Sequence, residues 1–242
     1  MPLWVMGDLH LSFDERVHKP MNRFGSRWTD HAEKIGKRWR ALVKPEDTVI
    51  VPGDISWGKN LDEAAADLKF LADLPGKKLL SEGNHDYWWT SVTKMRAFLH
   101  EISAENIDFL HNNAYSEDGR LIAGSRGWFL EENQQAAIFD TDYEKLVNRE
   151  CIRLSMSLDA AEKLGQEQNI TAPPLVFLHF PPVWGEFRVD PLVDVMLAHG
   201  VKECWHGHIH GRYDLPPYFD YRGIRFTNAA ADYLDFYPKP IG

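Results

Sequence analysis

The stretch Thr48-Val49-Ile50-Val51-Pro52-Gly53-Asp54 shows the pattern on which the fold depends. A continuous apolar run that is bounded by Pro or Gly predicts a strand covered on both faces. Similar runs precede polar residues elsewhere: residues 3–6 before Asp8, residues 78–80 before Asn84, and residues 175–178 before His179. The sequence therefore predicts buried strands that end in acidic, amide or imidazole side chains.

Amphipathic helices are predicted between these strands, over residues 29–43, 61–74, 91–102 and about 143–165. Their apolar residues recur three and four positions apart, which places them on one face of each helix. Thr29 is a plausible N-cap of the first helix, Pro75-Gly76 stops the second, and Gly165 ends the fourth. We interpret these apolar faces as core faces and not as cofactor sites.

Further strands are predicted in the second half of the chain. Residues 120–124 form one strand, and residues 219–226 alternate like a hairpin about Arg222-Gly223. Strand–helix alternation followed by hairpin-like strands predicts an α/β (α+β) fold: a four-layer αββα sandwich of two mixed β-sheets flanked by helices. No linker, low-complexity tract or repeat divides the sequence, so we expect a single domain over residues 1–242.

Composition narrows the functional classes. The 242 residues are 44% hydrophobic, which is enough for one full core, and a formal charge of -9 without a Lys/Arg-rich stripe argues against stable nucleic-acid binding. The two cysteines, Cys151 and Cys204, form no metal-ligand spacing and are expected to be reduced core thiols. The N-terminus lacks a basic region, and no apolar run approaches about 18 residues, so we expect a cytoplasmic protein without membrane contact.

Five clusters of candidate metal ligands follow the predicted strands. They are Asp8-Leu9-His10, Gly53-Asp54, Gly83-Asn84-His85-Asp86, Leu178-His179-Phe180 and Gly207-His208-Ile209-His210. In an extended segment, Asp-x-His and His-x-His place both side chains on one side, because strand side chains alternate. Gly-Asp alone is an ordinary turn and a lone histidine is usually a core residue, so it is the set of five that predicts a two-metal site.

The order of these clusters resembles the signature of the calcineurin-like metallophosphoesterase family, and the resemblance spans residues 8–210. It implies a double-sheet sandwich flanked by helices, in agreement with the pattern above. It also implies one metal ion held by Asp8, His10, Asp54 and His210, and a second held by Asp54, Asn84, His179 and His208. Asp54 would bridge the ions, because a carboxylate has two oxygens. Mixed N and O ligands suit Mn, Fe or Zn, and the ligand types leave the identity of the metal open.

Such a site predicts phosphoester hydrolysis. Two metal ions about 3.5–4 Å apart lower the pKa of a shared water toward 7, so that a bridging hydroxide is available to attack the phosphorus. His85 is the candidate proton donor to the leaving oxygen, and Asp86 is expected to orient its ring and raise its pKa. The alternative for Asp86 is a loop cap.

The motifs of this sequence differ from those of better-known branches of the family, and these differences narrow the expected substrate class. Ile55-Ser56-Trp57-Gly58 replaces the Val-Asp-Arg-Gly stretch of the eukaryotic-type protein phosphatases, and His85 stands where the lipid-A pathway pyrophosphohydrolases have arginine. A DNA-reading cap domain does not fit in 242 residues. We therefore expect a small bacterial-type phosphohydrolase that acts on a small phosphorylated substrate, as a phosphatase or a phosphodiesterase. A catalytically inactive scaffold with the same fold is the alternative, and the sequence leaves the oligomeric state open.

Substrate contacts are less well defined by the sequence. Residues 12–28 form a long connection that contains His18, Lys19, Arg23 and Arg27, and it is either a basic loop beside the site or a solvated surface loop. The aromatic residues that directly follow ligand motifs either stack on a substrate or pack beneath the metal loops; they are Trp57, Tyr87, Trp88 and Trp89.

Overall fold

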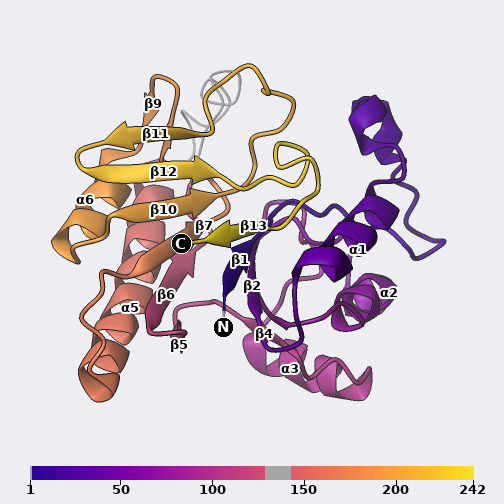
Figure 1. The fold of residues 1–242 in the computed structure, drawn as a ribbon, viewed down its shortest axis with the longest axis horizontal. Helices are drawn as coiled ribbons and strands as arrows, with labels where there is room; N and C mark the ends of the chain where they lie inside the picture. The colour runs from indigo at the N-terminus through magenta and orange to yellow at the C-terminus, as the bar shows by residue number, and fades with distance from the viewer. Residues whose placement is uncertain (1, 129–142) are drawn as a thin grey trace.

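The computed structural model describes residues 2–128 and 143–242, and its first sheet has the strand order β13-β1-β2-β3-β4 (Figure 1). The strands are β1 (Leu3–Val5), β2 (Thr48–Pro52), β3 (Lys77–Ser81), β4 (Ile107–Phe109) and β13 (Lys239–Ile241). Strands β1 to β4 are parallel to one another, and β13 runs antiparallel to β1. The strands predicted near residues 3–6, 48–51 and 78–80 are confirmed to within one residue at each end.

The second sheet has the order β11-β12-β10-β7-β6-β5. It consists of β5 (Ala114–Glu117), β6 (Arg120–Ser125), β7 (Leu175–Leu178), β10 (Glu203–His206), β11 (Tyr218–Tyr221) and β12 (Ile224–Asn228). The outer strands β5 and β11 are antiparallel to their neighbours, and the four inner strands are parallel. The predicted hairpin is confirmed: Tyr221 pairs with Ile224, and both turn residues, Arg222 and Gly223, have positive φ.

Helices cover the outer face of each sheet. α1 (His31–Leu42), α2 (Leu61–Ala72) and α3 (Val92–Glu101) pack on the first sheet, and α5 (Tyr143–Gln168) and α6 (Asp190–Ala198) pack on the second (Figure 1). Two short 3-10 helices, η1 (Met21–Phe24) and η2 (Ser26–Trp28), precede α1, and a small hairpin, β8 (Val183–Trp184) with β9 (Phe187–Arg188), follows β7. The predicted helices are confirmed, whereas α6 was not predicted.

Two predicted helix ends are wrong. The residue before α1 is Asp30, not Thr29, and it adopts a left-handed conformation without a side-chain cap. The fourth helix continues beyond Gly165 to Gln168. Gly165 serves close packing instead, because a Cβ there would lie 3.0 Å from the carbonyl oxygen of Ile170. By contrast, Asn60 caps α2 by accepting a hydrogen bond from the Glu63 N–H.

The core is divided into three layers, which confirms the four-layer αββα sandwich. Along β2, Val49 and Val51 point into the cluster beneath α1 to α3, whereas Ile50 points into a cluster between the sheets. Phe177 of β7 meets Ile50 in this inter-sheet cluster, and Val176 faces α5 and α6. This alternation explains why the strand sequences are apolar on both faces. The expected single domain over residues 1–242 includes residues 129–142, which lie outside the described residues.

The two sheets are joined where their parallel strands end. A bridge pairs Gly7, which follows β1, with Ala230, which follows β12. The Gly7 N–H donates to the Ala229 carbonyl at 2.8 Å, and the Ala231 N–H donates to the Gly7 carbonyl at 2.9 Å. The carboxyl ends of the strands of both sheets therefore meet at one edge, the usual position of a functional site in such folds.

Candidate metal centre

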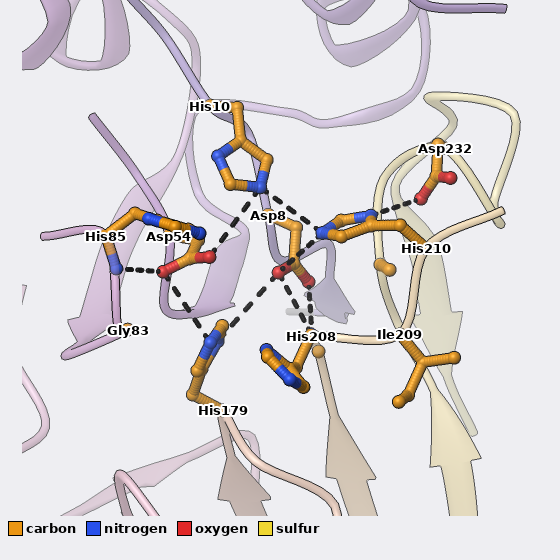
Figure 2. A network of polar contacts seen from close by, with 12 residues as sticks. Asp8, His10, Asp54, Gly83, His85, His179, His208, Ile209, His210 and Asp232 are labelled. Carbon is orange, nitrogen blue, oxygen red and sulfur yellow. Dashed lines mark hydrogen bonds and ion pairs between the residues drawn. The ribbon is translucent and has the colours of Figure 1, made fainter. Parts of the chain in front are cut away.

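The predicted ligands converge at this edge, and Figure 2 labels all of them except Asn84, whose Oδ1 lies 2.7 Å from Nε2 of His179. Asp8 and His10 follow β1, Asp54 follows β2, and the segment with Asn84 and His85 follows β3. The second sheet contributes His179 after β7, and His208 and His210 after β10. Each side chain is thus positioned by the end of a buried strand.

Four of these residues have a left-handed backbone, which turns the chain sharply after β1, β2 and β10. Asp8, His10, Asp54 and His208 have φ values of 57°, 47°, 52° and 70°. Asp and His tolerate this region better than most residues, but the conformation still carries a cost and is concentrated at functional sites. The cluster of four such residues at one point is consistent with a site that constrains its ligands.

Two motif glycines are required by close packing between motifs. A Cβ on Gly83 would overlap the backbone nitrogen and Oδ1 of Asp54. A Cβ on Gly207 would overlap Oδ2 of Asp8. The glycine of one motif therefore makes room for the carboxylate of another, which explains why glycine precedes the ligands in both motifs.

Asp8, His10 and His210 form one group whose donor atoms all lie within 4.8 Å of one another. Nε2 of His10 lies 3.2 Å from Nε2 of His210, and Nε2 of His210 lies 3.3 Å from Oδ1 of Asp8. Oδ2 of Asp54 is 3.6 Å from Nε2 of His10 and so faces the same point. Two imidazole nitrogens and carboxylate oxygens that converge in this way fit a divalent transition metal.

Asp8, Asp54 and His179 form a second group. Nε2 of His179 lies 3.6 Å from Oδ1 of Asp54 and 2.7 Å from Oδ1 of Asn84. Nδ1 of His179 lies 3.2 Å from the carbonyl oxygen of Pro52, which leaves Nε2 facing Asp54 and Asn84. The predicted partners Asp54, Asn84 and His179 are thus brought together, and Asp8 belongs to both groups.

His208 stands beside the second group. Its backbone N–H lies 3.0 Å from both carboxylate oxygens of Asp8, and its ring centroid lies 5.2 Å from that of His179 and 4.6 Å from that of Phe180. Within the described part of the chain, neither group of candidate ligands includes His208. The backbone of His208 therefore has an identified contact with the site, and the ligand role of its ring stays a prediction.

Burial shifts the pKa values of the acidic and imidazole side chains of the site. Burial raises the pKa of Asp8, and it raises the pKa of Asp54 well above its ordinary value, with Asp8 and Asp86 adding to the effect. Burial, together with the neighbouring histidines, lowers the pKa of His10 and of His179 well below the ordinary value. Neutral imidazole is the form that binds metals, and two buried carboxylates favour a cation between them. The residues therefore fit metal ions chemically.

Asp232 is a site residue that the sequence reasoning missed. It lies after β12, and its Oδ1 is 2.8 Å from Nδ1 of His210, while Gly211 and Tyr213 donate to its Oδ2. Burial lowers the pKa of His210, but Asp8 and Asp232 outweigh it and raise the pKa to about 10. A carboxylate on the outer ring nitrogen fixes the orientation of a ligating histidine. The position of Asp232 shortly after β12, which ends at Asn228, was the available signal.

The predicted partnership of Asp86 with His85 is not seen. Asp86 is buried, and its Oδ1 accepts hydrogen bonds from the Ile55 N–H, the Ser56 N–H and the Trp88 indole N–H, while its Oδ2 accepts one from the Gly83 N–H. These donors occupy both oxygens of the carboxylate, which thereby joins the loop after β2 to the loop after β3. The loop-cap alternative is therefore the better description.

His85 consequently has a different environment from the predicted one. Among the described residues, no polar atom is within hydrogen-bond distance of its buried Nδ1. Burial lowers the pKa of His85 to about 4, and the cations of Lys19, His210 and Arg126 add to this shift. The prediction that its pKa is raised is therefore wrong. Its backbone N–H donates to Oδ1 of Asp54 at 2.8 Å, which places the residue beside the centre.

The aromatic residues after the ligand motifs lie in different environments. Trp57 stacks on His10, with ring centroids 5.0 Å apart and planes at 24°, and it lies 4.2 Å from the ring of His85. Trp88 is buried in the core, and Trp89 packs against Phe109. Tyr87 is exposed. Packing beneath the metal loops is thus confirmed for Trp88, whereas Trp57 is part of the site.

Two basic residues of the 12–28 segment contact residues of the site, and Nζ of Lys19 lies 4.4 Å from the ring centroid of Trp57. The Arg27 guanidinium lies over the ring of Tyr213 and donates to the carbonyl of Asp232 at 3.1 Å. His18 and Arg23 are exposed. The segment therefore lies beside the site, and Lys19 is the residue that brings a positive charge close to His85.

Comparison with known families decides the assignment. The family model described as calcineurin-like phosphoesterase matches residues 1–212 of the chain. The protein belongs to the calcineurin-like phosphoesterase family. This match covers all five motifs of candidate ligands, and the two mixed sheets with flanking helices have the architecture of that family.

Individual proteins resemble this chain either over a short stretch of sequence or over the whole fold at low sequence identity. The chain is 32% identical over 83 residues to the Gene 66 protein of Mycobacterium phage L5; this match spans 34% of our chain and 39% of the phage protein. The fold is similar to phosphopantetheinyl hydrolase from Mycobacterium tuberculosis, with a TM-score of 0.55, 14% identity, and 99% and 95% of the two chains covered. It is also similar to TT1561 of Thermus thermophilus, with a TM-score of 0.55, 11% identity, and 96% and 89% covered. These two structures show the fold alone.

The described helices lack the features of a membrane span. Over residues 2–128 and 143–242, none is both long and apolar enough to span a membrane.

Proposed function

We propose that this protein hydrolyses a small phosphoester with the help of two bound transition-metal ions. The observation that carries the proposal is the position of Asp54. Its Oδ2 faces His10 and its Oδ1 faces His179, at 3.6 Å in each case, so that one carboxylate can join two ions. Mn, Fe or Zn is the expected metal, because the ligands combine imidazole nitrogen with carboxylate and amide oxygen.

The proposed ligand sets combine the two groups of candidate ligands with the sets that the family resemblance implies, which add Asp54 to the first ion and Asn84 and His208 to the second. One ion is held by Asp8, His10, Asp54 and His210, and the other by Asp54, Asn84, His179 and His208. When bound, such ions activate a shared water molecule for attack on phosphorus and neutralise charge on the phosphoryl oxygens. Burial keeps His10 and His179 neutral and therefore ready to bind, and Asp232 orients the ring of His210.

His85 is proposed to assist the departing oxygen. Its ring lines the cavity above the metal groups, and within the described residues its buried Nδ1 has no hydrogen-bond partner. A phosphoryl anion beside the ring favours protonation, opposite in sign to the effect of Lys19 and Arg126. A positioned imidazole N–H then stabilises the leaving oxygen, which matters most for poor leaving groups.

A small molecule, not a nucleic acid, is the proposed substrate. The formal charge of -9 opposes a polyanion, and the cavity above the centre is only about 260 Å³. The geometry is compatible with monoester and with diester hydrolysis, which the experiment below separates.

The test combines metal analysis with Mn-supported hydrolysis of p-nitrophenyl phosphate and bis(p-nitrophenyl) phosphate. The wild type is expected to bind two ions and to turn over at least one ester. Asp54→Ala is expected to lose both ions and the activity, whereas Asp62→Ala, which changes an exposed acid outside the site, retains both. Preference for the monoester indicates a phosphatase, and preference for the diester a phosphodiesterase. A fully metallated wild type without turnover of either ester contradicts the proposal and favours the scaffold alternative.

A further inference from the structure

The cavity above the metal centre has two chemically different walls. Its volume is about 260 Å³. One wall consists of the imidazoles of His10, His85 and His210. The rest is mostly apolar and is formed by Met21, Phe24, Trp28 and Trp57, with Gly211. A cavity that is lined by candidate ligands and by apolar side chains packed beside them suits a molecule with one ionic and one apolar end.

The apolar wall is built largely by the segment between β1 and α1. Met21 and Phe24 are the ends of η1, and Trp28 ends η2. Met21 and Trp28 are buried, but the side chain of Phe24 is 67% exposed. A single exposed phenylalanine is ordinary on a protein surface. Here, however, the exposed ring lines the same cavity as the candidate ligands His10 and His210.

Trp57 connects the apolar wall to the reacting groups. Its indole stacks on His10 and lies 4.2 Å from the ring of His85. The Lys19 ammonium lies 4.4 Å from the centroid of the same indole. The indole is only 7% exposed, and the part of it that lines the cavity gives the organic part of a bound ester an aromatic contact beside the histidines.

We propose, building on the function proposed above, that the phosphoester carries a small aryl or similarly flat apolar leaving group that binds between Trp57 and Phe24. Because His85 lines the same cavity, a group bound there has its ester oxygen next to this ring. Ligand pockets for drug-sized molecules measure about 300–1,000 Å³. A cavity of about 260 Å³ therefore selects a group of about one ring and excludes a nucleotide or a lipid chain from the enclosed part.

Binding of phosphonates tests this inference without dependence on leaving-group reactivity. Benzylphosphonate and ethylphosphonate both present a phosphonate to the Mn-loaded protein, and only the first has a ring. Isothermal titration calorimetry is expected to show that benzylphosphonate binds about tenfold more tightly. Phe24→Ala is expected to reduce this ratio about fivefold, mainly because benzylphosphonate binds more weakly. Phe24→Leu should retain part of the preference.

Phe13 offers a matched control in the same segment. It is 46% exposed, and its ring packs on Phe70, with centroids 4.9 Å apart, outside the lining of the cavity. Phe13→Ala is expected to leave the ratio unchanged. Equal affinity for the two phosphonates, no binding of either, or a ratio unaffected by Phe24→Ala would overturn the inference.

The outcome can be separated from that of the proposed hydrolysis. If the protein prefers benzylphosphonate but hydrolyses neither nitrophenyl ester, the proposed function is contradicted. The proposed aryl-binding site between Trp57 and Phe24, called the aryl site, is then supported. If it hydrolyses an ester with bound metal but shows no preference between the phosphonates, the proposed function stands and the aryl site fails.

Discussion

Nε2 of His10 and Nε2 of His210 lie 3.2 Å apart, although 200 residues separate them in the chain. Two unprotonated imidazole nitrogens at this distance would repel, so a proton on one ring is expected to lie between them. Against the effect of burial, Asp8 and Asp232 raise the pKa of His210 to about 10, which favours His210 as the donor. A cation that both nitrogens bind would replace this proton, and the pair therefore marks the centre of the first metal group.

Asp232 is expected to tune the metal affinity through His210. Asp232→Asn retains the shape of the side chain but removes the charge that supports the ring. Since carboxylates behind ligating histidines typically contribute about 10–100-fold, we expect about tenfold weaker Mn binding in calorimetry. Asp235→Asn, a change of an exposed neighbouring acid, is the control and should bind Mn like the wild type. Equal affinity of all three proteins would show that Asp232 has no such role.

His85→Ala is expected to separate metal binding from turnover. The variant should retain the metal content of the wild type, because the proposed ligands are unchanged. Its kcat on an alkyl phosphate should fall about 10²–10⁴-fold, and its kcat on p-nitrophenyl phosphate should fall less, because nitrophenolate leaves without assistance. Steady-state kinetics on both esters provide the measurement. An equal loss on both esters would argue against a role at the leaving oxygen.

Asp86→Ala is expected to destabilise the fold, because Asp86 clamps the loops that follow β2 and β3. In the wild type, four N–H groups donate to the Asp86 carboxylate over 2.8, 3.1, 3.0 and 2.8 Å; they belong to Ile55, Ser56, Trp88 and Gly83. The substitution leaves these four donors buried and without a partner. We expect the free energy of unfolding of the metal-free protein to fall by about 3 kcal/mol or more in urea titrations. His85→Ala is the neighbouring control and should unfold like the wild type. A stable Asp86→Ala protein with reduced turnover would restore a direct catalytic role for Asp86.

Asp67 is expected to make stability depend on pH. Burial raises its pKa to about 6 from 3.8, against hydrogen bonds from Ser56 and Phe13 that lower it. The folded state therefore holds the proton more tightly, and this contribution to stability is full below about pH 4 and lost as the pH rises through about 6. Two pKa units correspond to about 3 kcal/mol.

Asp67→Asn mimics the neutral form and removes this dependence. In urea unfolding of the metal-free proteins, the unfolding free energy of the variant minus that of the wild type should rise by about 3 kcal/mol between about pH 4 and 7. A difference that does not change with pH would show that Asp67 titrates normally.

The strands and the ligand positions could be predicted because their signals are local. The apolar run of β2 and the Gly53-Asp54 that follows it are adjacent in sequence, and the same holds for β7 and His179. The roles of Asp86 and Asp232 could not be predicted, because their partners are distant in sequence. Asp86 accepts hydrogen bonds from Ile55 and Ser56 after β2, and Asp232 contacts His210 after β10. Helix α6 was missed for a similar reason, since its apolar residues acquire meaning only against α5 and the second sheet.

The apolar wall of the cavity was also beyond sequence analysis. The 12–28 segment was considered for its basic residues, yet Met21, Phe24 and Trp28 line the cavity. Only the path of η1 and η2 across the site shows which side chains face the ligands. Trp57 was identified as a candidate for stacking, and its contacts with His10 and His85 place it beside the reacting groups.

The most direct test of the metal centre is anomalous diffraction from crystals of the Mn-loaded protein. Two strong peaks about 3.5–4 Å apart are predicted, with one oxygen of Asp54 bound to each ion, His10 and His210 on one ion, and His179 on the other. A single peak, or two peaks that do not share Asp54, would contradict the two-metal account.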